Sequence, residues 1–182
     1  MTPQTDPEAL IRKYCQGNKE LEQVLLRHSS DVARRAELIA SRHPELELDM
    51  RFLHEAAMLH DIGCTLVDAP GIHCHGTEPY IRHGILGGQL LRSEGLPRHA
   101  RVAERHTGTG LTADEIVRQQ LPLPHQDLTP ETLEEQIICY ADKFYSKSHL
   151  EREKTPEQAL RSLEKFGEAG LAVFRGWMER FE

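Results

Sequence analysis

The side chains best suited to chemistry in this chain are its imidazoles. Eleven histidines stand among 182 residues, more than the Phe, Tyr and Trp residues combined. His28 follows Leu25 by three positions and precedes Val32 by four, so it lies on an apolar helical stripe and is expected to point inward. A buried imidazole needs hydrogen-bonding partners or a metal. Taken alone, a histidine at such a position is more often a hydrogen-bonded core residue than a ligand.

A second candidate group is the run Ala-Ala-Met-Leu-His-Asp-Ile-Gly at residues 56–63, in which an apolar helix ends in an imidazole and a carboxylate. Burying Asp61 there costs free energy unless a cation or a metal compensates its charge, and His60 is a natural co-ligand. The alternative is a polar helix end in which Asp61 accepts hydrogen bonds from loop amides. The pair His60-Asp61, called the dyad below, leaves both alternatives open when taken alone.

Three further groups extend the set. Asp142 lies in an apolar helical turn, where either a metal or a salt bridge to Lys143 would compensate its charge. His83 precedes Gly84, where a small residue lets another helix or a ligand approach closely. His106 ends a helical segment and opens the turn Thr-Gly-Thr-Gly at residues 107–110.

Together these positions predict one metal site with nitrogen and oxygen ligands. Four helices each bring an imidazole or a carboxylate inward, and the dyad brings two. The set lacks thiolates and suits iron, manganese, zinc, cobalt or nickel, with iron or manganese favoured. Six ligands exceed what one structural zinc binds, so two divalent transition-metal ions bridged by a carboxylate are expected, with open positions for water and substrate. The six candidate ligands are His28, His60, Asp61, His83, His106 and Asp142.

Helices must position these groups. A capping side chain stands before proline at Asp6, Thr129 and Thr155, and apolar residues recur at helical spacing between such starts. No segment alternates convincingly enough to be a strand. We therefore expect an all-α bundle of about six to eight helices in a single domain over residues 1–182, with a core at about 20–150 and a C-terminal helix at 156–181 packed on it. The expected helices are 7–15, 18–42, 49–62, 80–94, 97–106, 112–120, 130–147 and 156–181.

Two long connections, residues 63–79 and 121–130, are rich in turn formers, and loops of this length are often functional lids. His73 and His75 lie in the first of them; we expect them to face solvent, and a third-metal or substrate role is the alternative. The remaining histidines are interpreted as incidental. His54 is expected to lie on a different helical face from His60. The other four are expected to be exposed, namely His43, His99, His125 and His149.

Composition and charge exclude several classes. The formal net charge of -7 disfavours an extended nucleic-acid surface, since neutralising phosphates needs a coherent basic face. No run is apolar over the ~20 residues of a membrane span, and the first residues are polar and acidic, unlike a signal peptide. The cysteines form no Cys-x-x-Cys pair and are expected to be reduced, as in a cytoplasmic protein. They are Cys15, Cys64, Cys74 and Cys139.

The ordered set His28, His60-Asp61 and Asp142, with His-Asp-Ile-Gly at residues 60–63, resembles the HD-domain superfamily, an all-helical family of metal-dependent phosphohydrolases. The resemblance covers about residues 20–150. It implies that His28, His60 and Asp142 hold one metal, that His83 and His106 hold the other, and that Asp61 bridges them. It also gives His60 and Asp61 the catalytic roles, in which a metal-activated hydroxide cleaves a phosphoester or phosphoanhydride of a small nucleotide-like substrate.

Local motifs narrow the expected substrate. The segments at residues 83–88 and 106–110 are similar to small bacterial enzymes that split diadenosine tetraphosphate symmetrically, although residues 141–147 depart from them. No Gly-Tyr-Pro follows His106, which disfavours the cyclic di-guanylate phosphodiesterases. We expect a small phosphorylated substrate, such as a nucleotide or dinucleoside polyphosphate, and no binding to extended nucleic acid or to a membrane. The sequence leaves pairing with a second copy of the chain open. The candidate phosphate-binding residues are Arg105, Thr107, Thr109, Lys143 and Lys147.

Two other functions stay open. Some six-ligand HD-domain proteins resemble this chain in ligand order and use a mixed-valent di-iron pair to oxidise a small organic substrate with oxygen. A metal-stabilised helical module that binds a nucleotide or a partner helix without catalysis is the third hypothesis. The complete ligand set argues against the third, since a decayed site is expected to lose ligands.

Overall fold

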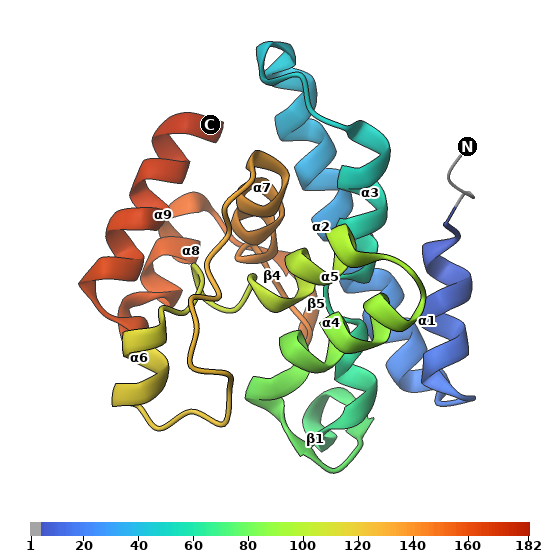
Figure 1. Cartoon of the computed structure of the whole chain (residues 1–182). Coiled ribbons are helices and arrows are strands. Elements are labelled where there is room, and N and C mark those ends of the chain that lie inside the picture. Colours follow the sequence, from blue (N-terminus) through green and yellow to red (C-terminus); the bar gives the residue numbers. More distant parts are fainter. Residues whose placement is uncertain (1–4) are drawn as a thin grey trace.

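The computed structural model describes residues 5–182. The expectation that the chain lacks a signal peptide rests partly on residues 1–4, which lie outside this range. The described chain is predominantly helical, as predicted (Figure 1). Its α-helices are α1 Pro7–Cys15, α2 Lys19–Arg42, α3 Met50–Leu59, α4 His83–Ser93, α5 Pro97–Glu104, α6 Ala113–Arg118, α7 Leu133–Asp142, α8 Pro156–Ser162 and α9 Glu168–Phe181.

The helix starts follow local capping chemistry. Asn18 and Asp49 accept hydrogen bonds from the first turns of α2 and α3. Thr132 and Thr155 form capping boxes with the residues three positions later, at the starts of α7 and α8. The cap of α7 is therefore Thr132 rather than Thr129, because the reciprocal pair of Thr132 with Glu135 satisfies two backbone N–H groups.

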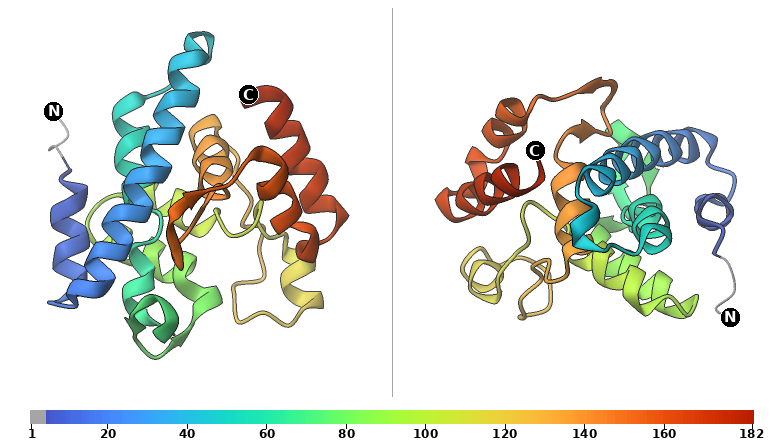
Figure 2. Two further views of the ribbon diagram at one scale, coloured as in Figure 1. Left: turned by 180° about the vertical axis from the view of Figure 1, so that it is seen from behind. Right: turned by 90° about the horizontal axis from the view of Figure 1, so that it is seen from above.

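The long helix α2 lies at the centre of the core, where it packs against α3 and α7. Helix α7 lies between α2 and the C-terminal helix α9, while α1 covers the opposite side of the molecule (Figure 2). One cluster of buried apolar residues runs from Ile11 of α1 to Phe181 of α9. On α9, Phe174, Trp177 and Phe181 lie around the ring of Tyr140, so this helix packs on the core.

The expectation that the chain has no strand is wrong. Strand β1 (Val67–Ala69) pairs antiparallel with β2 (Cys74–His75) and parallel with β3 (Glu78–Pro79) in the connection after the dyad. Strand β4 (Tyr145–Ser146) and strand β5 (His149–Glu153) form an irregular antiparallel hairpin. Strands of two to five residues are too short for alternating hydrophobicity to be recognised.

Two predicted helices are shorter than expected, each for its own local reason. The helix expected at 130–147 ends at Asp142, where the chain turns into the β4–β5 hairpin. The helix expected at 156–181 is divided into α8 and α9 by a 3-10 turn and Gly167, whose φ of +91° breaks the helical path. In the part of the chain described, residues 5–182, no helix has both the length and the apolar character to cross a membrane.

Candidate metal centre

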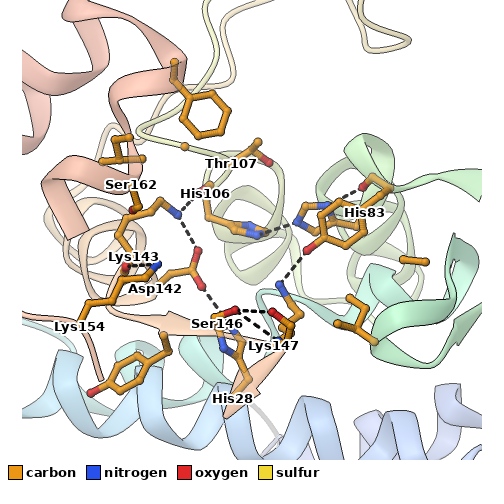
Figure 3. A pocket seen from close by; sticks show the side chains of 18 of the residues that line it. His28, His83, His106, Thr107, Asp142, Lys143, Ser146, Lys147, Lys154 and Ser162 are labelled. Atoms are coloured by element: carbon orange, nitrogen blue, oxygen red, sulfur yellow. Dashed lines mark hydrogen bonds and ion pairs between the residues drawn. The ribbon is translucent and has the colours of Figure 1, made fainter. Parts of the chain in front are cut away.

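The six candidate ligands lie together, and they come from five helices or from residues that directly follow them. His28 is in the middle of α2, the dyad follows the end of α3, and His83 is the first residue of α4. His106 comes just after α5, and Asp142 is the last residue of α7. All are buried except Asp142, whose side chain remains slightly exposed. Figure 3 shows His28, His83, His106 and Asp142 directed into a common space.

A first group of ligand atoms converges around Asp142 and one oxygen of Asp61. His28 Nε2 lies 3.0 Å from Asp142 Oδ1 and 3.2 Å from Asp61 Oδ2. His60 Nε2 lies 3.3 Å and 3.1 Å from the same two oxygens. One ligand atom of each of the four residues lies within 4.8 Å of the others, so the group has the size to hold a metal ion.

A second group forms around the other oxygen of Asp61. Asp61 Oδ1 lies 3.2 Å from His106 Nε2 and 3.5 Å from His83 Nε2, and these three residues also have ligand atoms within 4.8 Å of one another. The two carboxylate oxygens of Asp61 therefore face different imidazole pairs. This is the arrangement of a bridging ligand.

Backbone carbonyls orient three of the rings. Nδ1 of His60, His83 and His106 each lies 2.6–2.7 Å from the carbonyl oxygen three residues earlier in the chain. A carbonyl only accepts, so each Nδ1 donates its hydrogen, and Nε2 is the nitrogen left to face the carboxylates. Such outer contacts orient histidine ligands in metal sites.

The charges at the site are strongly coupled. Burial opposes ionisation of Asp61, but the positive charges of His60 and Lys147 lower its pKa well below the ordinary value. Burial also favours the neutral form of His60, yet the charges of Asp61 and Asp142 outweigh this and raise its pKa to about 10. Burial and the neighbouring His106 lower the pKa of His83 to about 3. Metal binding must displace the proton of His60, since only an unprotonated ring nitrogen is a ligand.

Two lysines contact the carboxylates. Lys147 Nζ lies 2.7 Å from Asp61 Oδ2 and 3.0 Å from the Tyr80 hydroxyl oxygen. Lys143 Nζ lies 2.6 Å from Asp142 Oδ2 and donates to the carbonyl oxygen of His106. The salt bridge considered as an alternative for Asp142 is therefore present, and it coexists with the imidazole contacts on the other oxygen.

A cavity of about 570 Å³ opens onto this centre. Of the candidate phosphate-binding residues, Thr107, Lys143 and Lys147 line it. Arg105 lies outside its wall and bonds instead to the Thr129 carbonyl and to Glu131. Thr109 also lies outside the wall, beside Gly170 of α9.

The other histidines follow the predictions with one exception. His54, His125 and His149 are exposed and His43 is partly so; His73 and His75 lie outside the cavity wall, the former half-buried and the latter exposed. His99, predicted to be exposed, is buried, because its Nε2 bonds Glu55 at 3.1 Å and its ring packs edge-on against Phe52. All four cysteines are buried and free of disulfides, as expected.

Sequence reasoning missed several residues of the cavity. The ring of Tyr80 stacks on that of His83, with centroids 4.6 Å apart, and so joins Lys147 to the second imidazole group. Lys154, Lys165 and Phe166 line the outer part of the cavity. The clustering of lysines after residue 142 is a sequence signal that could have indicated Lys154 and Lys165.

A family model for the HD domain matches residues 25–146, a span that contains all six clustered ligands. The chain belongs to the HD-domain family. The resemblance inferred from the ligand order is thereby confirmed. HD domains bind divalent metals, and the two groups built around Asp61 are suited to this.

Curated proteins similar to this HD-domain chain are longer than the matched region. A tRNA (cytidine(56)-2'-O)-methyltransferase of Picrophilus torridus is 33% identical over 73% of this chain and 35% of its own length. The enzyme of the same name from Thermoplasma volcanium is 32% identical over 67% of the chain and 32% of its own length. The uncharacterized protein MJ0778 of Methanocaldococcus jannaschii is 36% identical over 58% of this chain and 56% of its own length. The chain thus spans about a third to a half of these relatives. No solved structure matches it significantly.

Proposed function

We propose that this HD-domain chain is a hydrolase that uses two divalent transition-metal ions to cleave a phosphoester or phosphoanhydride of a small phosphorylated substrate. The observation that carries the proposal is the position of Asp61, whose Oδ2 faces His28 and His60 while its Oδ1 faces His83 and His106. A carboxylate shared in this way is the feature expected of a two-metal site.

The donor set fits such ions. His28, His60, Asp61 and Asp142 would hold one ion, and Asp61, His83 and His106 the other. Nitrogen and oxygen donors without a thiolate suit manganese and iron, among other divalent metals. When bound, two such ions supply Lewis acidity toward a phosphoryl oxygen and lower the pKa of a bound water toward neutrality.

The protein's own groups contribute binding and orientation. The ammonium groups of Lys143 and Lys147 stand at the edge of the centre, within ion-pair distance of Asp142 and Asp61. Metal ions on these carboxylates would compete with the lysines for the same oxygens and leave ammonium hydrogens for substrate phosphate. Thr107 adds a hydroxyl donor in the cavity wall, next to the second imidazole group.

The methyltransferase activity in the names of two relatives does not extend to this proposal. The chain corresponds to about a third of those proteins, and residues 25–146 of this chain match the family model for the HD domain. The phosphate-directed chemistry is argued from the centre itself, in which metal ligands, ammonium groups and a cavity of about 570 Å³ adjoin one another.

The test is the hydrolysis of a panel of phosphorylated compounds by metal-loaded protein, in which the release of both phosphate and nucleotide products is measured. Nucleoside mono-, di- and triphosphates, dinucleoside polyphosphates and sugar phosphates would be compared with manganese, cobalt or iron present. We expect metal-dependent release from at least one class. Release from none of them by protein that contains the metal would overturn the proposal.

The same experiment separates hydrolysis from oxidation by a di-iron pair. Full activity with manganese or cobalt without oxygen is expected of the hydrolase. Activity only with iron, accompanied by substrate-dependent oxygen uptake, would instead identify an oxygenase.

A further inference from the structure

The cavity extends beyond the HD domain. The family match ends at residue 146, yet the cavity wall continues through Ser148, Lys154, Ser162 and Phe166. Ser148 lies between β4 and β5, and Lys154 directly follows β5. Ser162 is the last residue of α8, and Phe166 lies in the 3-10 turn after it. Figure 3 shows Lys154 and Ser162 on the side of the cavity where Lys143 and Asp142 lie. A segment outside the residues matched by the family model thus contributes to the cavity wall.

Lysine is concentrated in this wall. The sequence contains six lysines, and four of them line the cavity, whereas no arginine does among residues 5–182. The chain as a whole carries a formal charge of -7, and among the described residues Asp142 is the only acidic side chain of the cavity lining. The four lysines are Lys143, Lys147, Lys154 and Lys165. A positive surface in an acidic chain focuses the local field on anionic ligands.

The inner and outer lysines differ in their partners. Lys143 and Lys147 form ion pairs with the carboxylates of the metal centre. Within residues 5–182, no carboxylate lies within ion-pair distance of Lys154 or Lys165. Lys154 Nζ has only a long contact, 3.4 Å, to the carbonyl oxygen of Lys143. Among the described residues, the outer ammonium groups thus have no carboxylate as a direct partner.

The position of Lys154 makes that charge unfavourable without an anion. Its side chain is half-buried, and burial lowers its pKa. The charge of Asp142 opposes this, but the charges of Lys143 and Lys165 add to the lowering, and the net shift of the pKa is downward. Three ammonium groups on one wall repel one another, and an anion between them would relieve the repulsion.

We propose that Lys154 and Lys165 form a distal anion subsite, so that the substrate carries at least one phosphate beyond the group cleaved at the metal centre. The substrate class is then a compound with a chain of phosphates, with the group for hydrolysis at the imidazoles and the next phosphates along the lysine wall. This inference rests on the proposed function. It adds a residue pair outside the HD domain that selects polyphosphorylated over monophosphorylated compounds.

The exposed ring of Phe166 stands next to Lys165 at the rim of this subsite. An aromatic face at the rim gives a planar group of the substrate a place to stack. The arrangement suits a nucleoside attached to the far end of the phosphate chain.

The experiment compares the binding of two probes to metal-loaded protein by calorimetry. The probes are adenosine monophosphate and a methylene-bridged adenosine triphosphate analogue that resists hydrolysis. The variants are Lys154→Gln, Lys165→Gln and the double substitution. The control is Lys19→Gln, which removes the same charge from an exposed lysine of α2 that pairs with Glu22, away from the cavity. Thermal unfolding establishes that each variant is folded.

We expect the wild type to bind the triphosphate analogue more tightly than the monophosphate. The double variant should raise the Kd of the analogue by about tenfold, the equivalent of ~1.4 kcal/mol, and so reduce the ratio between the two probes. The control should leave that ratio as in the wild type. An unchanged ratio in the double variant would overturn the subsite.

The outcome is distinguishable from failure of the proposed function. If the ratio falls in the double variant but no compound of the panel is hydrolysed, the anion subsite stands and the hydrolase proposal fails. If compounds are hydrolysed and the ratio is unaffected, the hydrolase proposal stands and the subsite is wrong. The binding measurement needs no turnover, so each result is read independently.

Discussion

His83 and His106 face each other through their Nε2 atoms, 3.0 Å apart. Each ring donates its Nδ1 hydrogen to a backbone carbonyl, and burial lowers the pKa of both rings, so both Nε2 atoms carry lone pairs. Two lone pairs at this separation repel each other unless a proton or a cation lies beside them. The pair with the nearest oxygen of Asp61 is thus arranged to bind a cation.

Metal removal should therefore lower the stability of the fold. A ligand present at 100 times its Kd stabilises the folded state by about 2.7 kcal/mol. For a chain of this size the corresponding shift in Tm is about 5–10 °C. Calorimetric unfolding with and without a chelator measures it, and addition of manganese should restore the higher Tm. A Tm that is insensitive to chelator would argue against a metal at this centre.

Replacing the shared carboxylate should affect both ion sites. Asp61→Asn removes the charge that faces both imidazole pairs. We expect the metal content to fall from two ions per chain to one or none, and phosphate release to fall by at least about 100-fold. Elemental analysis and initial rates measure the two effects. Asp114→Asn, at an exposed position of α6, is the matched control; an Asp61→Asn protein with two ions and full activity would refute the bridging role.

Gly63 should tolerate no side chain. A Cβ at this position would lie 1.9 Å from the His83 carbonyl oxygen and 2.4 Å from the Gly87 nitrogen, both backbone atoms of α4. Gly63→Ala must therefore separate α4 from the dyad, at a cost of about 1–3 kcal/mol or more, and it should weaken metal binding at His83.

The matched substitution is Gly176→Ala in α9, where a Cβ would meet no atom within 4 Å. Alanine in an exposed helix interior should raise the free energy of unfolding by about 0.5–1 kcal/mol. Urea denaturation distinguishes the two, and equal effects of both substitutions would contradict the close approach at Gly63.

The buried His99 should make the fold sensitive to acid. Burial lowers its pKa, and the charge of Glu55 opposes this only in part. Below about pH 6.5 the unfolded chain takes up a proton that the folded His99 does not, so the free energy of unfolding falls as the pH falls. Above that pH both states are neutral and the contribution of His99 is complete.

His99→Gln keeps a donor for Glu55 and has no titrating ring. We expect the loss of stability between pH 7.5 and 5.5, measured by urea denaturation of metal-loaded protein, to be smaller in this variant than in the wild type. His54→Gln, at an exposed position of α3, is the control. An equal loss in His99→Gln and in the wild type would show that His99 does not contribute to the acid sensitivity.

Much of the fold was predictable because helix formation is signalled locally. Capping residues, prolines at helix starts and apolar stripes lie within a few residues of the structure they specify, as in α2 and α8. The strands β1–β5 were missed because each is short and its partner strand is set by the surrounding packing. His99 was misjudged because Glu55, which bonds it, is 44 residues away in the chain.

The identity of the clustered groups was already contained in the sequence. Periodicity places His28 inside, and the dyad and Asp142 stand in apolar helical segments where a carboxylate needs a compensating charge. Only the folded structure shows which oxygen of Asp61 faces which imidazole pair. It also shows which lysines of the cavity wall have no carboxylate partner among the described residues. These contacts are made between helices that are distant in the sequence. They depend on how whole helices pack together, and the spacing of residues along the chain does not determine this packing.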